Sequence, residues 1–100
     1  MTAYHMQRLV HVGINPNVIF PATRREAIEK YFNTVATDWF RYGSQNYVLY
    51  TNAELDALTQ GLTQLPGMQG AFVFATEISP FALGGMMPSQ FWDWLNKPRW

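Results

Sequence analysis

The stretch that decides the fold runs from Asp38 to Thr51 and reads DWFRYGSQNYVLYT. Aromatic and β-branched side chains, which favour strands, fill its two ends at Trp39 to Tyr42 and at Tyr47 to Thr51. The residues between them, GSQN at 43–46, are typical of a turn. The stretch therefore predicts a β-hairpin, and we expect its rings to form cross-strand pairs.

A helix is expected on each side of this hairpin. Thr23-Arg24-Arg25-Glu26 has the form of a capping box, in which the Thr and Glu side chains satisfy free N–H groups of the first helical turn. Apolar residues follow at helical spacing as far as Val35, so this helix should end near Asn33 to Ala36. After the hairpin, Asn52 can cap a second helix that Pro66-Gly67 ends. The apolar stripe of this second helix is Leu55, Leu58, Leu62 and Leu65.

Two further strands are predicted at the ends of this order. Residues 4–14 alternate between apolar and polar side chains, although Arg8 interrupts the apolar face, and Asn15-Pro16-Asn17 then ends the strand. Residues 70–78, GAFVFATEI, restore the period of two. One face of this last strand carries Phe72, Phe74 and Ile78.

The resulting order is strand, helix, strand, strand, helix, strand. It predicts an α+β protein with the ferredoxin-like βαββαβ arrangement, an antiparallel four-stranded sheet with two helices on one face. A chain of 100 residues is expected to form one domain. We place the ferredoxin-like core at 1–79 and a C-terminal loop and short aromatic helix at 80–100. Within the latter, PFALGGMMP at 80–88 is a connector and Ser89 caps a helix that Pro98 halts. This tail packs either on its own core or on a partner subunit.

The composition restricts the classes of function. Hydrophobic residues make up 48% of the chain and charged residues 14%, and seven basic and seven acidic side chains give a net charge of zero. Long-range attraction to nucleic acid is therefore not built into the whole molecule. The absence of Cys fits a reducing compartment, and no apolar run has the length of a signal peptide or membrane span. A cytoplasmic location is expected.

Catalytic and metal-binding patterns are lacking in the sequence. His5 and His11 share a strand face but are about 20 Å apart by the strand rise, so they cannot bind one ion together. Turn or capping roles already explain Ser44, Ser79 and Ser89, and the glycines match no phosphate-binding loop. No catalytic residue, metal site or cofactor is therefore predicted.

Two arginines stand where acidic residues are usually favoured. Arg24 and Arg25 occupy the first turn of the first helix, where the helix dipole favours acidic residues. Either Glu26 and Glu29 neutralise them, or they form an anion subsite with the free N–H groups of the helix start. The role of Arg41 in the hairpin stays open. The candidate anion or partner site consists of Asn15, Asn17, Arg24, Arg25 and Arg41.

Aromatic residues are the other unusual feature. Four Trp, five Tyr and seven Phe give more ring surface than a core of this size readily hides, and aromatic residues are enriched at protein interfaces. The candidate interface residues are Trp39, Tyr42, Phe91, Trp92, Trp94 and Trp100.

The pattern also resembles a known family. A first strand that ends in a turn, a helix, W-x-x-Y before a polar break, the strand YVLYT, an L-x-x-L helix and then AFVFATEI resemble small SinR-like proteins. These resemble in turn the ferredoxin-like CRISPR adaptation proteins, which dimerise through their sheets. In the CRISPR-associated relatives, a carboxylate at the end of the first strand is associated with metal-dependent nuclease activity. The matching stretch here, HVGINPN, holds Ile14, Asn15 and Asn17 and no Asp or Glu, so the resemblance implies the fold and dimerisation but not nuclease activity.

These observations favour a non-catalytic binding or assembly module that forms a homodimer through its sheet and aromatic tail. The alternative is a nucleic-acid-binding or nuclease-like protein, with Arg24, Arg25 and Arg41 against phosphates and Trp39 and Tyr42 against bases. A third hypothesis is a small-molecule pocket under Gly84-Gly85, with Met86 and Met87 as an adaptable wall.

Overall fold

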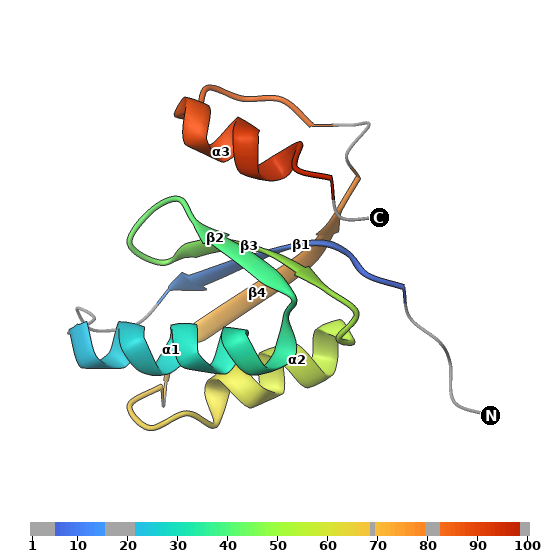
Figure 1. Cartoon of the computed structure of the whole chain (residues 1–100). Helices are drawn as coiled ribbons and strands as arrows, with labels where there is room; N and C mark the ends of the chain where they lie inside the picture. The colour runs from blue at the N-terminus through green and yellow to red at the C-terminus, as the bar shows by residue number, and fades with distance from the viewer. Residues whose placement is uncertain (1–5, 16–21, 69, 80–82, 99–100) are drawn as a thin grey trace.

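The structure, a computed structural model, describes residues 6–15, 22–68, 70–79 and 83–98 (Figure 1). Asn17, Trp100 and the side chain of Thr23 lie outside this description. The predicted α+β class and order of elements are confirmed, and the short helix expected after the sheet is present. The elements are β1 (Arg8–Asn15), α1 (Ala22–Val35), β2 (Asp38–Arg41), β3 (Asn46–Thr51), α2 (Leu55–Thr63), β4 (Phe72–Ile78) and α3 (Ser89–Leu95).

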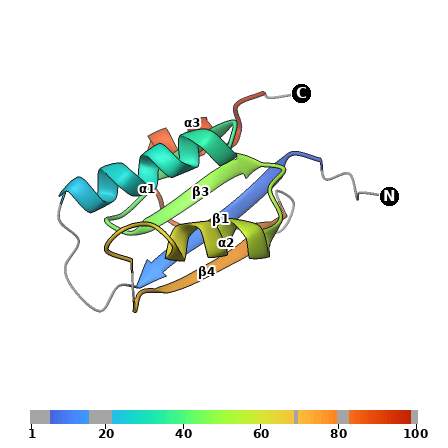
Figure 2. The same ribbon diagram turned by 90° about the horizontal axis from the view of Figure 1, so that it is seen from below.

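The four strands form one antiparallel sheet in the order β2-β3-β1-β4. This order fits the split βαβ arrangement of ferredoxin-like domains. Helices α1 and α2 pack on one face of the sheet, which we call the helix face, while α3 lies against the opposite face, which we call the tail face (Figures 1 and 2).

Alternation along β1 supplies both faces. Val10, Val12 and Ile14 are buried on the helix face, and Leu9 is buried on the tail face. The main core therefore lies between the sheet and helices α1 and α2, and a smaller apolar cluster lies under α3. Beside the β1 residues, the main core contains Ile28, Phe32, Tyr47, Leu49, Leu58, Leu62 and Met68; the smaller cluster contains Leu9, Val48, Tyr50 and Phe91.

The hairpin at 38–51 forms as predicted, and one pair of its rings, Trp39 and Tyr47, meets across the strands on a diagonal. The register places Trp39 opposite Leu49 and Phe40 opposite Val48. The ring centroids of Trp39 and Tyr47 lie 5.8 Å apart. Further contacts of the hairpin rings run to helices: Trp39 and Tyr47 contact Phe32 of α1, and Phe40 and Tyr42 contact Phe91 of α3.

None of the three predicted helix caps is in the capping position. Helix α1 begins at Ala22, so Thr23 already lies inside it. Helix α2 begins at Leu55, with Glu54 rather than Asn52 in the capping position and no capping bond from its side chain. Helix α3 includes Ser89 as its first residue, and Pro88 precedes it. Packing of the apolar residues on the sheet fixes where these helices begin, and a side-chain cap is not required for that. Within the described ranges, no helix has the combination of length and apolar character that crossing a membrane requires.

The period of two predicted for the last strand is confirmed, and its aromatic side points away from the main core. Val73 and Ala75 pack on the core, whereas Phe72 and Phe74 lie on the tail face and are 68% and 66% exposed. They share this face with Ile78, which packs on the cluster under α3. Helix α3 therefore covers only part of the tail face.

Candidate functional site

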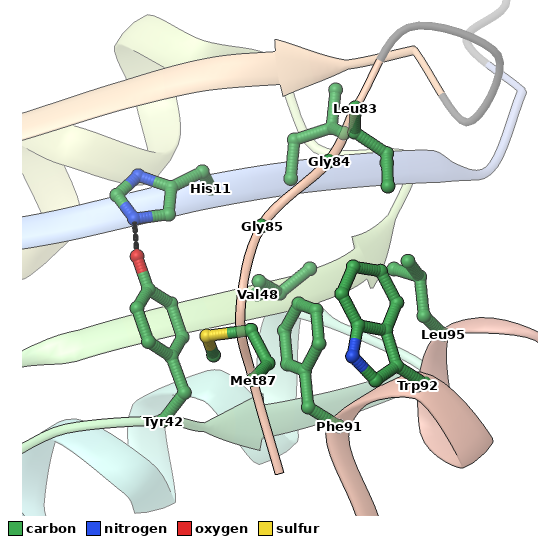
Figure 3. Close-up of a pocket in the computed structure, with 11 residues that line it drawn as sticks. His11, Tyr42, Val48, Leu83, Gly84, Gly85, Met87, Phe91, Trp92 and Leu95 are labelled. Carbon is green, nitrogen blue, oxygen red and sulfur yellow. Dashed lines mark hydrogen bonds between the residues drawn. The ribbon is translucent and has the colours of Figure 1, made fainter. Parts of the chain in front are cut away.

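A cavity of about 190 Å³ lies between the tail face and the C-terminal segment, and we call it the tail pocket. Figure 3 shows residues 83–87 crossing over the strands, with α3 forming one side. The strand residues that line the pocket all lie on the tail face, because alternation along each strand brings such residues to one surface. The sheet and hairpin contribute His11, Tyr42, Val48 and Ile78, and the C-terminal segment contributes mainly Leu83, Met87, Phe91, Trp92 and Leu95.

His11 and Tyr42 form the polar end of the tail pocket. The Tyr42 hydroxyl is hydrogen-bonded to Nε2 of His11, and the two ring centroids are 5.6 Å apart (Figure 3). Burial lowers the pKa of His11 and raises the pKa of Tyr42, because both charged forms would lose water. At neutral pH the pair is therefore uncharged and holds one shared hydrogen bond.

The pocket hypothesis from the sequence places two methionines in the wall, and the structure separates them. Met87 lines the tail pocket with Gly84 and Gly85. Met86 is 98% exposed and does not line it. The two side chains are adjacent in the sequence but lie in different surroundings.

A second candidate surface lies on the uncovered part of the tail face. Phe72 and Phe74 line a shallow hollow of about 280 Å³ together with Gly13, Asn15 and Asn46. We call these five residues the β4 surface. Strand β4 pairs with β1 along one edge, and no described strand pairs with its other edge. The β4 surface therefore combines exposed rings with free backbone hydrogen-bonding groups.

Arg41, whose role the sequence leaves open, is paired on the helix face. Its Nε lies 3.2 Å from Oε2 of Glu29, and its Nη1 donates to the Gly43 carbonyl over 3.3 Å. The Tyr47 hydroxyl donates to the same Glu29 oxygen over 3.0 Å. Burial, and then the charge of Glu29, raise the pKa of Tyr47. Arg41 thus links the hairpin to α1, and its charge is largely balanced.

The remaining residues of the candidate anion site do not converge. Arg25 is near enough to Tyr47 for its charge to lower the pKa of that hydroxyl, so it belongs to the neighbourhood of Arg41. The guanidinium of Arg24 lies against Gly67, in the turn after α2. Asn15 lies on the opposite face of the sheet, in the β4 surface. The structure therefore brings Arg25 and Arg41 together but leaves Arg24 and Asn15 apart from them.

Trp39 and Tyr42 lie on opposite faces of the sheet. Trp39 packs on the main core, and its indole nitrogen donates to Oδ1 of Asn33 over 2.8 Å. Tyr42 packs under α3, with its ring centroid 5.8 Å from that of Phe91. The two rings therefore do not form a common stacking platform. The sequence already indicates this, because Trp39 and Tyr42 are three residues apart, and side chains separated by an odd number of residues on a strand point to opposite faces.

The aromatic tail packs on its own sheet, which is one of the two arrangements expected from the sequence. Phe91 is 9% exposed and contacts the ring of Phe40, with centroids 5.7 Å apart. The rings of Trp94 and Phe40 have centroids 5.8 Å apart. Nζ of Lys97 also lies 3.4 Å from a carboxylate oxygen of Asp38, next to this contact. Phe91, Trp92 and Trp94 therefore make much of their contact with residues of the same chain.

Sequence reasoning did not single out His11 with Tyr42, or Phe72 with Phe74, as sites. Phe72 and Phe74 have a detectable signal, because the period of two places them on one face of the same strand. His11 and Tyr42 belong to different parts of the sheet, so alternation along one strand does not relate them. The register that places His11 opposite Val48, and Val48 opposite Phe40, is what brings His11 near Tyr42. That register comes only from the structure.

The described residues contain no group of three or more His, Asp or Glu side chains that could hold a metal ion. Comparisons with protein families, with curated proteins and with solved structures found no match for this chain. The resemblance to SinR-like and CRISPR adaptation proteins therefore stays a prediction.

Proposed function

We propose that this protein is a non-catalytic binding and assembly module that forms a homodimer through β4. The observation that carries the proposal is the exposure of Phe72 and Phe74, at 68% and 66%, on one face of β4, which is an edge strand of the sheet that the described residues form. Large apolar side chains exposed next to one another are typical of a contact surface.

The two edges of the sheet differ in a way that favours β4. Strand β2, at the other edge, has four residues and carries Asp38 and Arg41, and short or charged edge strands resist pairing. Strand β4 has seven residues, lacks Pro and Lys, and carries one charged side chain, Glu77. A second copy of β4 can therefore add antiparallel to the first and continue the sheet.

Symmetry makes this contact self-complementary. A two-fold axis perpendicular to the sheet relates antiparallel edge strands, so the tail faces of both copies lie on the same side. Phe72 and Phe74 of the two copies then form one apolar stripe across the joint sheet. A net charge of zero means that no long-range repulsion opposes the approach of the two copies.

The aromatic tail has a supporting role in this proposal. The tail cluster around Phe91 and Trp94 covers the tail face over β1, β2 and β3 and reaches Ile78 of β4, but it leaves Phe72 and Phe74 open. The tail thus limits where a second copy can bind. The cytoplasmic location expected from the sequence stays a prediction, and the nucleic-acid alternative has no observation that favours it, because Arg41 pairs with Glu29 and Trp39 lies in the main core.

The test is the solution mass by light scattering over a range of concentrations, at low and high salt. We expect a dimer that persists at high salt, because the contact is apolar and uses backbone hydrogen bonds. The double variant Phe72→Thr, Phe74→Thr should be a monomer, since Thr keeps the strand propensity but removes the rings.

The matched control is Met86→Thr, which removes an apolar side chain that is 98% exposed outside the sheet. This variant should remain a dimer. A monomeric parent protein, or equal association of the double variant and the parent protein, would sink the proposal. Circular dichroism checks that each variant is folded, and we expect it to be, because the replaced side chains are exposed.

A further inference from the structure

The described lining of the tail pocket carries no charged side chain. Among these residues there is no Asp, Glu, Lys or Arg, and those with an N–H or O–H group in the side chain are His11, Tyr42 and Trp92. The remaining lining residues are aliphatic, aromatic, Met or Gly. An ionised ligand would lose its hydration in this pocket without a counter-charge, so the pocket suits an uncharged molecule.

The size of the pocket sets the size of that molecule. A cavity of about 150 Å³ lined by apolar side chains is large enough to bind benzene. The tail pocket, at about 190 Å³, has room for one six-membered ring and a small substituent. Phe91 and Trp92 present aromatic surfaces from α3, and Met87 adds a thioether, which packs well against rings.

The polar end of the tail pocket, formed by His11 and Tyr42, determines which substituent the ring of the ligand should carry. A hydroxyl group can donate one hydrogen bond and accept others, and the hydrogen bond to His11 uses only one of these capacities of Tyr42. Depending on which partner of that bond donates, Tyr42 can still accept from or donate to a ligand. A hydroxyl group on the ligand can form a hydrogen bond with Tyr42 in both cases, because it can donate and accept. A carbonyl oxygen can only accept, so it can bind only where Tyr42 donates.

We propose that the tail pocket binds small uncharged phenols, with the ring against Phe91 and Trp92 and the hydroxyl group at Tyr42. Figure 3 shows the arrangement that supports this orientation: His11 and Tyr42 lie toward one end of the group of residues, and Trp92 and Leu95 lie toward the other. This binding does not depend on the β4 surface, so it can succeed or fail separately from dimerisation.

The experiment is a titration of the full chain with phenol and, in parallel, with toluene, followed by two-dimensional amide NMR. The two probes have nearly the same shape, but toluene lacks the hydroxyl group. We expect saturable shifts at the amides of His11, Tyr42, Met87 and Phe91, and about fivefold tighter binding of phenol than of toluene, which is the ratio typical of one hydrogen bond.

Tyr42→Phe is the decisive variant, because it keeps the ring and removes the hydroxyl group. It should reduce phenol affinity to that of toluene and leave toluene binding unchanged. Tyr31→Phe is the matched control, since Tyr31 also donates a hydrogen bond through its hydroxyl, to the Leu58 carbonyl, but on the helix face. It should bind both probes as the parent protein does.

Three results would overturn the proposal: phenol shifts that do not saturate, shifts centred away from the tail pocket, or equal binding of phenol and toluene by the parent protein. The amide spectrum itself reports whether Tyr42→Phe is folded. If that variant does not fold, the ratio of phenol to toluene affinity in the parent protein still decides the question. Ile78→Phe, which adds volume to the wall, should weaken both probes.

Discussion

Replacing Phe91 by Ala tests whether the aromatic tail holds the tail face. Phe91 is 9% exposed, so nearly the whole side chain leaves water on folding. Burial of a Phe side chain contributes about 1.5–3 kcal/mol, and each well-placed ring pair adds about 0.5–1.5 kcal/mol. Phe91 has such contacts with Phe40, Tyr42 and Trp92, with centroids 5.2–5.8 Å apart. We expect the free energy of unfolding to fall by about 3 kcal/mol. This value is near the lower end for Phe→Ala substitutions in cores, because α3 can move inward and partly fill the cavity.

The measurement is urea unfolding followed by far-ultraviolet circular dichroism at one protein concentration. Gln90→Ala is the control, because Gln90 is an exposed residue of the same helix and its loss should change stability by less than about 0.5 kcal/mol. Hydrogen exchange adds a local readout: a helix of seven residues is not stable alone, so the amides of α3 should lose protection before those of β1. A loss below about 1 kcal/mol for Phe91→Ala, or unchanged protection of α3, would refute the reasoning.

Three further predictions concern single residues. Gly67→Ala should lower the free energy of unfolding by about 1–2 kcal/mol in the same urea assay, because Gly67 has a φ of 84° and a Cβ there would lie 2.8 Å from Nε of Arg24. Thr51→Val should cost about 2 kcal/mol by thermal or urea unfolding, because the fully buried Thr51 hydroxyl donates to one backbone carbonyl and accepts from one backbone N–H, and Val leaves both without a partner. Burial lowers the pKa of His11 below its ordinary 6.5, so the unfolded chain binds the proton more readily and the stability from the neutral imidazole is lost as the pH falls below 6.5. His11→Gln should remove part of this pH dependence, and an identical pH profile for variant and parent protein would contradict the assignment.

The sequence predicts the elements of the fold well because each has a local cause. The apolar spacing of the two helices and the hairpin turn act over a few residues, and the structure has α1, α2 and the β2–β3 hairpin where they indicate. The helix starts at Leu55 and Ser89 differ from the expected caps because packing on the sheet is non-local. Such packing has no signature in a short window of sequence.

The candidate sites were harder to predict because they depend on which face of each strand is covered. Alternation places Phe72 and Phe74 together, but only the position of α3 shows that they stay exposed. Likewise, Arg41 could face a phosphate or an acidic side chain, and the pairing with Glu29 depends on how α1 packs on the sheet, which is a non-local contact. The placement of Trp39 and Tyr42 is an exception that the sequence alone could give, because their spacing of three residues is enough to place them on opposite faces of the sheet.

The position of α3 also bears on how the chain is made. The cluster under α3 joins Leu9 and Val48, which are synthesised early, to Phe91, which is synthesised late. While a ribosome is still adding the residues between them, the tail face has no cover of its own, and its apolar side chains are open to other proteins. A nascent chain of this protein should therefore expose the apolar cluster of the tail face until α3 has emerged and docked.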